Sequence, residues 1–201
     1  MYNNIVFDLG NVILNIDMGR VRSSFIDLGI TEIDEKFAAL SAEDVFNRYE
    51  TGKISTDEFC AAIRNHANVT LTDADVIGAW NDILLDYRME TVQKIAELKQ
   101  SHRLFLLSNI NAAHLEWVQR EAINKLGLTQ LDDLFEKAYY SHLVGMRKPD
   151  TEIYRHVLAD AGLLASETLF IDDLEINILG ANSVGIQTHW LLPGEKVEDI
   201  L

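Results

Sequence analysis

Polar side chains that could act on phosphorus or bind a metal directly follow three short apolar runs of the chain. The runs are Ile5–Phe7, Leu104–Leu107 and Leu169–Ile171. The residues after them, together with a lysine that precedes a proline, are Asp8, Ser108, Asn109, Asp172, Asp173 and Lys148. In open parallel sheets ligands bind beyond the carboxyl ends of the strands, so we expect these side chains to converge although they lie far apart in the sequence.

Three aspartates at one point would repel one another unless a cation lay among them. Hard oxygen ligands suit Mg²⁺, which takes a few carboxylates and completes its shell with water and phosphate oxygens. A carboxylate beside the metal can attack phosphorus and become an aspartyl-phosphate, and Asp8 is the candidate nucleophile. The Ser108 hydroxyl, backbone N–H groups and the Lys148 ammonium would bind the phosphoryl oxygens. Lys148 would also keep Asp8 ionised.

Each of these residues alone has a simpler structural interpretation. Asp8 and the paired aspartates could cap the turns that follow them, and the Ser-Asn pair could be a loop or a helix N-cap. Lys148 could be a solvated charge in a loop before a helix that begins near a proline. The order and the strand-end placement of all the residues together favour the chemical interpretation.

The apolar runs are near-continuous, which is typical of strands buried on both faces of a parallel sheet. Ile186–Trp190 and Ala138–Ser141 are two further candidate strands. Between the runs, apolar residues recur at helical spacing over Met89–Gln100 and Asp150–Ala161. Alternating strands and helices predict an α/β fold with a doubly wound, Rossmann-like, mostly parallel sheet and right-handed crossovers.

The segment between about Asn15 and Arg88 interrupts this alternation, and we expect no strand in it. Its candidate helix starts are Ser41, Ser55 and Thr72. Ser55 and Glu58 have the spacing of a capping box. The pattern predicts a small all-α cap inserted after the first strand. Residues 15–88 would form this cap subdomain, and residues 1–14 and 89–201 would form the α/β core domain.

Four motifs occur in the order found in the haloacid dehalogenase superfamily, which the sequence resembles over essentially its whole length. They are Phe7-Asp8-Leu9-Gly10-Asn11-Val12, Leu107-Ser108-Asn109, Lys148-Pro149-Asp150 and Ile171-Asp172-Asp173. Within the superfamily, the segments FDLGNVI, RYETGKIS, LSNINAAH and GMRKPD are similar to a subgroup that contains bacterial α-D-glucose-1-phosphate phosphatase and the phosphatase domain of soluble epoxide hydrolases.

The resemblance implies a Mg²⁺-dependent phosphatase that hydrolyses a small phosphorylated metabolite, a sugar phosphate such as glucose 1-phosphate. Asp8 would be the nucleophile. The side chains that hold the phosphoryl group would be Ser108, Asn109 and Lys148. The metal ligands would be Asp8, the carbonyl of Gly10, Asp172 and Asp173, and the residues alone leave open which of the last two is the main ligand. The cap would close over the site and read the leaving group, with Glu50 as its substrate-binding residue.

Gly10 is a departure from most phosphatases of the superfamily, which carry a second aspartate two residues after the nucleophile. That aspartate is a general acid and base, a role worth about 10²–10⁴-fold in rate. Glycine at this position also occurs in the glucose-1-phosphate phosphatase subgroup, by resemblance. We hypothesise that the anomeric oxygen of a sugar 1-phosphate needs less protonation, and that a cap residue such as Glu50 or His66 supplies the rest. Asp17 is expected to be a helix N-cap rather than a replacement acid.

Three other functions are compatible with the same fold. A haloacid dehalogenase needs no metal and usually carries an uncharged residue at the place of the paired aspartates, so Asp172 and Asp173 argue against it. A phosphomutase depends on the acid–base aspartate, so Gly10 argues against it. A catalytically silent binding protein has Gly10 as its only support, and the nucleophile, lysine and metal carboxylates argue against it.

Composition limits the partners. The chain has 201 residues and a formal net charge of −15, which disfavours binding to nucleic acid or to anionic membranes. It contains no apolar run of ~18 residues and no N-terminal signal pattern. Its single cysteine fits a reducing cytoplasm. We therefore expect a cytoplasmic protein with a small phosphorylated substrate, and the sequence leaves open whether it is a monomer or a homodimer.

Overall fold

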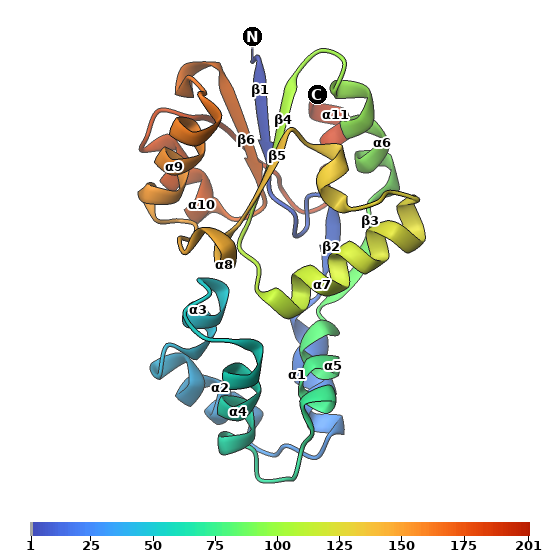
Figure 1. The fold of residues 1–201 in the computed structure, drawn as a ribbon, viewed down its shortest axis with the longest axis vertical. Helices are drawn as coiled ribbons and strands as arrows, with labels where there is room; N and C mark the ends of the chain where they lie inside the picture. Colours follow the sequence, from blue (N-terminus) through green and yellow to red (C-terminus); the bar gives the residue numbers. More distant parts are fainter. Residues whose placement is uncertain (1) are drawn as a thin grey trace.

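The computed structural model describes residues 2–201, whose centre is a five-stranded parallel sheet (Figure 1). The strands are β1 (Asn4–Phe7), β4 (Arg103–Ser108), β5 (Lys137–Tyr140), β6 (Thr168–Asp172) and β7 (Gln187–Trp190). Their order in the sheet is β5-β4-β1-β6-β7, so the chain runs outward from β1 in both directions. All five predicted strands are present, each within a residue of its expected bounds.

Apolar residues on both faces explain why these segments form central strands. Ile5 and Phe7 of β1 contribute to one buried cluster, and Val6 between them contributes to the other. Neighbouring strands repeat the alternation, because Phe105 lies on the Val6 side and Leu106 on the Phe7 side. Each face is therefore a separate hydrophobic core.

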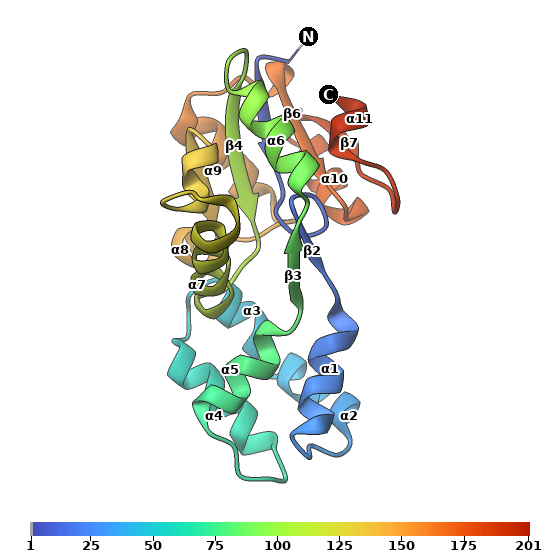
Figure 2. The same cartoon turned by 90° about the vertical axis from the view of Figure 1, so that its right-hand side faces the viewer.

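Helices cover both of these faces (Figure 2). The first cluster takes side chains from α6 (Met89–Leu98), α7 (Ala112–Glu121) and α11 (Val197–Ile200). The second takes side chains from α9 (Thr151–Ala161) and α10 (Glu175–Asn182). The predicted doubly wound α/β fold is confirmed. The remaining short elements of the core are the π-helical turn Ala122–Leu126, the 3₁₀ turns Leu131–Leu134 and Ala165–Glu167, and α8 (Ser141–Val144).

Five helices between β2 and β3 form the cap, a separate body below the sheet in Figure 1. They are α1 (Met18–Asp27), α2 (Ile33–Ala42), α3 (Val45–Glu50), α4 (Thr56–His66) and α5 (Asp73–Asn81). Their apolar faces surround a third buried cluster that includes Phe25 and Phe59. The division into a core of residues 1–14 and 89–201 and a cap of residues 15–88 remains a prediction.

Local signals of the cap are mostly confirmed. Ser55 and Thr72 each cap a helix through a reciprocal capping box, and Asp17 accepts a hydrogen bond from the backbone of Gly19 at the start of α1. The helix start expected at Ser41 is wrong, because Ser41 lies in the last turn of α2. Its Ser-x-x-Asp spacing resembles a cap, but the helix begins eight residues earlier, at Ile33.

The expectation that no strand lies between Asn15 and Arg88 is wrong. β2 (Leu14–Ile16) and β3 (Leu84–Tyr87) pair antiparallel and form a two-stranded stem that joins the cap to the core (Figure 2). Backbone hydrogen bonds extend the pairing on both sides, from Asp17 to Ile83 and from Arg88 to Ile13. Strands this short have too few residues for alternation to show in the sequence.

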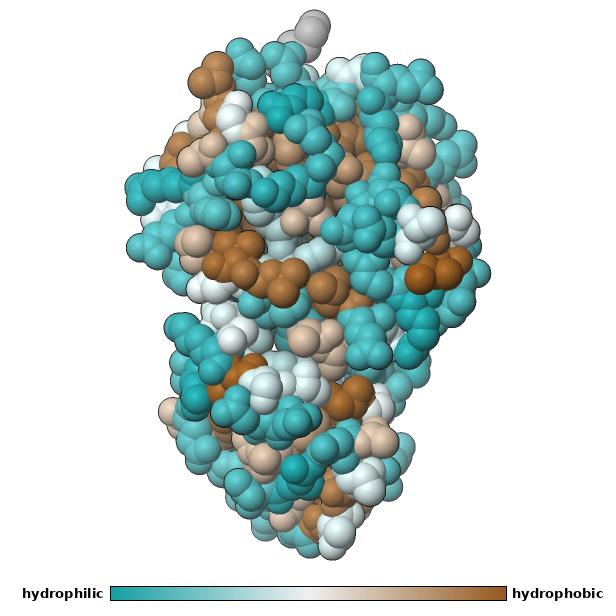
Figure 3. All heavy atoms as spheres, viewed as in Figure 1, coloured by the Kyte–Doolittle hydropathy of each residue, from teal (hydrophilic) through white to brown (hydrophobic). Residues whose placement is uncertain are grey.

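The surface of the view in Figure 3 is mainly hydrophilic, with separate apolar patches. Within residues 2–201, none of the helices has the length and apolar character needed to cross a bilayer.

Candidate active site

Three neighbouring strands bring the predicted residues together at the carboxyl edge of the sheet. β1 lies between β4 and β6, with Phe7 opposite both Leu106 and Ile171. Asp8 therefore follows the central strand, Ser108 ends the strand on one side and Asp172 ends the strand on the other. Asp8, Ser108 and Asp172 are all buried, and Asp172 is fully so.

Lys148 is the cation of this cluster. Its ammonium Nζ lies 2.6 Å from Asp8 Oδ1 and 2.6 Å from Asp172 Oδ2, and only 1% of the residue is exposed. The side chain of Asn109 holds the lysine backbone from both sides. Its Nδ2 donates to the Lys148 carbonyl at 2.8 Å, and its Oδ1 accepts from the Lys148 N–H at 2.9 Å.

Asp172 and Asp173 are bound by the protein in different ways. Asp172 accepts hydrogen bonds from Lys148, from the Leu174 backbone N–H and, at both oxygens, from the Asn177 amide. Within residues 2–201, Asp173 accepts a side-chain hydrogen bond from only one other residue, Asn11, at 3.0 Å. Asp173 thus has free ligating capacity, whereas the oxygens of Asp172 are occupied by donors.

The three carboxylates fit a hard divalent cation. One oxygen each of Asp8, Asp172 and Asp173 lies within 4.8 Å of the others. With all three carboxyl groups ionised, the one ammonium of Lys148 leaves an excess of two negative charges at the site. A Mg²⁺ ion would balance that excess.

The pKa values of Asp8 and Lys148 without a bound cation also favour a further positive charge at the site. Burial raises the pKa of Asp8 to about 7, the Lys148 charge opposes this rise, and Asp172 and Asp173 add to it. Burial also works against the charge of Lys148, but Asp8 and Asp172 outweigh it and raise the pKa of the lysine. A further positive charge at the site would lower the pKa of Asp8 and favour its ionised, nucleophilic form near neutral pH.

Comparison with known proteins gives the family of this constellation. The profile of the haloacid dehalogenase-like hydrolases matches residues 2–185. D-ribitol-5-phosphate phosphatase of Bacteroides thetaiotaomicron is 32% identical over 188 residues, which are 94% of this chain and 91% of that protein. The chain belongs to the haloacid dehalogenase-like hydrolases.

Solved structures of this family superimpose closely. A family enzyme of Bacteroides thetaiotaomicron, in complex with magnesium and inorganic phosphate, has a TM-score of 0.92 at 35% identity and covers 100% of both chains. A family hydrolase of Porphyromonas gingivalis has a TM-score of 0.89 at 32% identity and covers 100% of this chain and 96% of its own. The superfamily predicted from the four motifs is confirmed.

For a haloacid dehalogenase-like hydrolase, the surroundings of Gly10 are unusual. A Cβ atom at this position would lie 3.2 Å from Ile16 Cδ1 and 3.8 Å from Asp8 Oδ2. Ile16 belongs to the stem strand β2, so an aliphatic side chain lies beside the position where most phosphatases of the superfamily carry the second aspartate. The role of the Gly10 carbonyl as a metal ligand remains a prediction.

The cap approaches the site through the end of α3. Glu50, the last residue of α3, forms an ion pair with Arg147 at 2.9 Å, and its carbonyl accepts from the Ser141 hydroxyl at 2.6 Å. Burial raises the pKa of the Glu50 carboxyl, which Arg147 opposes. Arg147 immediately precedes Lys148, so the cap contact and the buried lysine share one loop.

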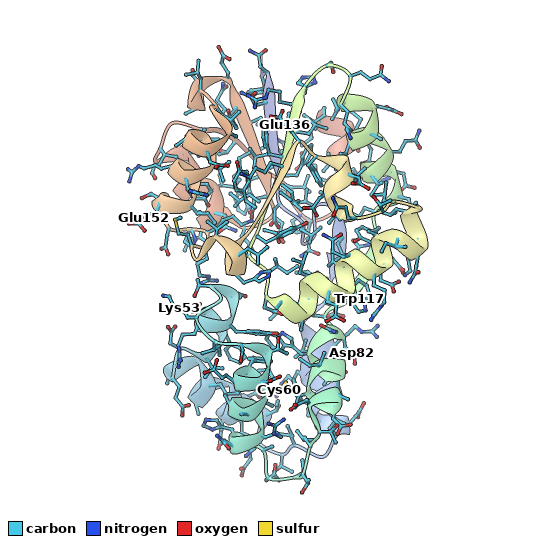
Figure 4. All side chains as sticks on the ribbon, in the orientation of Figure 1. Lys53, Cys60, Asp82, Trp117, Glu136 and Glu152 are labelled. Atoms are coloured by element: carbon cyan, nitrogen blue, oxygen red, sulfur yellow. The ribbon has the colours of Figure 1, made fainter. Side chains whose placement is uncertain are left out.

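The other cap candidates have different surroundings. His66 pairs with Glu43 at 3.1 Å on the surface of the cap, which argues against it as the missing acid. Lys53 is exposed at the outer edge of the cap beside α3 (Figure 4) and lines a polar groove with Arg147 and Asp150. Cys60 is buried inside the cap.

Sequence reasoning missed three residues that build the site. Arg147 directly precedes Lys148, and Asn11 directly follows Gly10. This proximity to predicted site residues was the signal in the sequence that could have identified them. Asn177, in the first turn of α10, carries no signal that separates it from an ordinary helix residue. Asn109 was predicted to bind the phosphoryl group, a role that stays a prediction. Its side chain contacts the Lys148 backbone through one N–H of the amide and the amide oxygen, so a second N–H stays available for a phosphoryl oxygen.

Proposed function

We propose that this protein is a Mg²⁺-dependent phosphatase that hydrolyses a small sugar or polyol phosphate through an aspartyl-phosphate on Asp8. The observation that carries the proposal is the buried cluster in which Lys148 bridges Asp8 and Asp172 at 2.6 Å each, with Asp173 alongside. A nucleophilic carboxylate, a fixed ammonium and a divalent-cation site are the parts that phosphoryl transfer requires.

The reaction has two halves. An Asp8 carboxylate oxygen first forms a bond to phosphorus while the ester P–O bond breaks, and the departing oxygen takes up a proton to become the alcohol product. Water then forms a bond to phosphorus while the bond to Asp8 breaks, which releases inorganic phosphate and a proton and restores the carboxylate. The Lys148 ammonium, which pairs with Asp8 before the reaction, would then stabilise the negative charge on the phosphoryl oxygens. The Ser108 hydroxyl would donate a hydrogen bond to one of these oxygens.

The residues that would hold Mg²⁺ are Asp8, Asp173 and the carbonyl of Gly10. When bound, the ion would neutralise charge on the phosphoryl oxygens and keep Asp8 ionised. Asp172 contributes a carboxylate to the cluster, but its hydrogen bonds to Lys148, Leu174 and Asn177 favour a second task, which is to hold the lysine. Asp173 is therefore our choice for the main ligand.

The substrate class follows from the cap. Glu50 presents a half-buried carboxylate, which can accept hydrogen bonds from hydroxyl groups, and Arg147 fixes it over the loop of Lys148. A leaving group rich in hydroxyls matches such a partner. The motif resemblance favours glucose 1-phosphate within this class, whereas the relative from Bacteroides thetaiotaomicron acts on ribitol 5-phosphate.

Gly10 separates these two substrates. A sugar 1-phosphate leaves through its anomeric oxygen, which needs less protonation than the primary alcohol of a 5- or 6-phosphate. Of the two cap residues considered, we propose Glu50 as the proton donor, because burial raises the pKa of its carboxyl and it lies against the loop of Lys148, whereas His66 lies at the cap surface beside Glu43. A clear preference for sugar 6-phosphates or ribitol 5-phosphate over sugar 1-phosphates would contradict this explanation.

The test is phosphate release from sugar 1-phosphates, sugar 6-phosphates, ribitol 5-phosphate and nucleotides, with Mg²⁺ and with EDTA. We expect turnover of the sugar and polyol phosphates that EDTA abolishes, and in Glu50→Gln both a higher KM and a lower kcat. Glu43→Gln is the matched control, because Glu43 lies in the same cap but pairs with His66. An absence of turnover on every substrate would favour the silent binding protein, and turnover that survives EDTA would refute the metal dependence.

A further inference from the structure

Asn11 has a left-handed backbone conformation, with a φ of +52°. Asparagine is among the few residues with a Cβ atom that adopt this region readily, and glycine adopts it without steric cost. The backbone N–H of Asn11 donates to the Leu14 carbonyl at 2.7 Å, which closes the turn between β1 and β2. The turn alone would accept glycine, so the presence of an asparagine directs attention to what its side chain does.

The side-chain amide of Asn11 bridges two parts of the molecule. Its Nδ2 donates to Asp173 Oδ2 at 3.0 Å, and its Oδ1 accepts from the Ile16 backbone N–H at 3.3 Å. This orientation of the amide is the only consistent one, because a carboxylate can only accept and a backbone N–H can only donate. Ile16 is itself paired with Leu84, so the amide is anchored on the stem that carries the cap.

Asp173 depends on this amide for its orientation. Asp172 is held by Lys148, Leu174 and Asn177, whereas Asn11 is the one other residue of the described chain that donates to the Asp173 side chain. The bond occupies Oδ2 and leaves Oδ1 for a metal. Residues that hydrogen-bond a ligating group orient it, and removing them typically weakens metal binding about 10–100-fold.

We propose that Asn11 is a positioning residue that orients Asp173 toward Mg²⁺ and ties this carboxylate to the stem strand β2. The inference rests on the magnesium site proposed above. It assigns to Asn11 a part in metal affinity rather than in the chemical step, since the side chain contacts neither Asp8 nor Lys148 by a hydrogen bond within residues 2–201.

The test is calorimetric titration of Mg²⁺ into the full-length wild-type protein, Asn11→Gly and Asn68→Gly. Glycine accepts the positive φ of position 11, so Asn11→Gly removes the amide and keeps the turn. Asn68 is the matched control, because its amide likewise bridges a backbone N–H and a side chain, both of Thr31, within the cap.

We expect the Kd for Mg²⁺ to rise about 10–100-fold in Asn11→Gly and to stay unchanged in Asn68→Gly. The melting temperature of Asn11→Gly in EDTA should match that of the wild type, and raising the Mg²⁺ concentration should restore its turnover. A wild-type Kd in folded Asn11→Gly would overturn the role of Asn11. If the wild-type protein bound no Mg²⁺, the magnesium site would be overturned, and this inference with it.

Discussion

Lys148 is the side chain on which the charge balance of the site depends. Its side chain is buried between Asp8 and Asp172, and the Asn109 amide fixes its backbone. A buried ion pair adds little net stability, but removing one partner leaves the other charge buried without compensation. The same cation that handles phosphate in the proposed mechanism therefore also permits two carboxylates to be buried.

We predict that Lys148→Met lowers the free energy of unfolding by about 3–5 kcal/mol when measured in EDTA above neutral pH. Chemical denaturation of the variant and the wild type gives the difference. Lys137→Met is the matched control, since Lys137 pairs with Asp160 at the surface and should lose less than about 1 kcal/mol. Equal losses in the two variants would contradict the proposed charge balance.

Gly10 gives a second prediction at this scale. Gly10→Asp should raise turnover of sugar 6-phosphates by up to about 10²-fold, because it supplies the missing acid, and should change sugar 1-phosphates much less. The tightest contact of the new Cβ atom would be with Ile16 Cδ1, the flexible end of an aliphatic chain, at 3.2 Å. Gly10→Asn has the same shape without the acid and should show no gain. A gain in both variants would mean that space, not protonation, limits the reaction.

Helix α3 and the short helix α8 meet at a contact that leaves no room for a side chain. Gly52, just after α3, has a φ of +67°, and a Cβ atom there would lie 2.2 Å from the His142 carbonyl oxygen. On the other side of the active site, a Cβ at Gly180 of α10 would lie 2.5 Å from the Pro149 carbonyl oxygen, next to Lys148. The absence of a side chain at these glycines lets the end of α3 approach α8 and lets α10 approach the loop of Lys148.

We predict that Gly52→Ala raises the KM for substrate and lowers stability by roughly 1–3 kcal/mol, because α3 must move off α8 and takes Glu50 with it. Steady-state kinetics and thermal unfolding measure the two effects. Gly78→Ala is the control in the same cap. Nothing lies within 4 Å of its Cβ position in α5, so alanine should raise stability by up to about 1 kcal/mol. An unchanged KM in Gly52→Ala would show that this contact does not position Glu50.

The sequence predicts elements where each one carries its own signal. β1, β4 and β6 are predicted from continuous apolar runs, so the strand ends and their polar residues follow. α4 is predicted from its capping box and α5 from the helix start at Thr72. The stem strands β2 and β3 are missed because they are short and only partly buried, so they show neither a continuous apolar run nor a detectable alternation. The hydrogen bonds of Asn177 and Arg147 are missed because they depend on how α10 and the cap pack, and a single sequence contains no record of packing.

At the scale of the whole molecule, cap and core also touch between α5 and α7. His114 of α7 stacks on Trp80 of α5, with ring centres 5.2 Å apart. His114 Nε2 lies 3.1 Å from the Trp80 carbonyl, and Nδ1 lies 3.1 Å from Asn111 Nδ2. Because the carbonyl only accepts and the amide nitrogen only donates, His114 is neutral with its proton on Nε2.

This contact predicts a pH dependence of stability. Burial lowers the pKa of His114 to about 4, against about 6.5 in the unfolded chain, so the unfolded state binds the proton more readily. The contribution of neutral His114 to the free energy of unfolding is complete above pH ~6.5. It is lost as the pH falls towards 4, and the loss amounts to up to about 3 kcal/mol. Unfolding titrations at several pH values should show that the free energy of unfolding falls more steeply with decreasing pH in the wild type than in His114→Gln. Equal slopes would contradict a neutral His114.

The most direct test of the central claim is a search for phosphate bound to Asp8. We would quench the protein in acid during turnover of a sugar phosphate with Mg²⁺ and identify the phosphorylated peptide by mass spectrometry, in the wild type, Asp8→Asn and the control Asp17→Asn. The mechanism predicts an acyl phosphate on Asp8 in the wild type and in Asp17→Asn. In Asp8→Asn it predicts neither a phosphorylated peptide nor phosphate release. Phosphate release that persists in Asp8→Asn would contradict the assignment of Asp8 as the nucleophile.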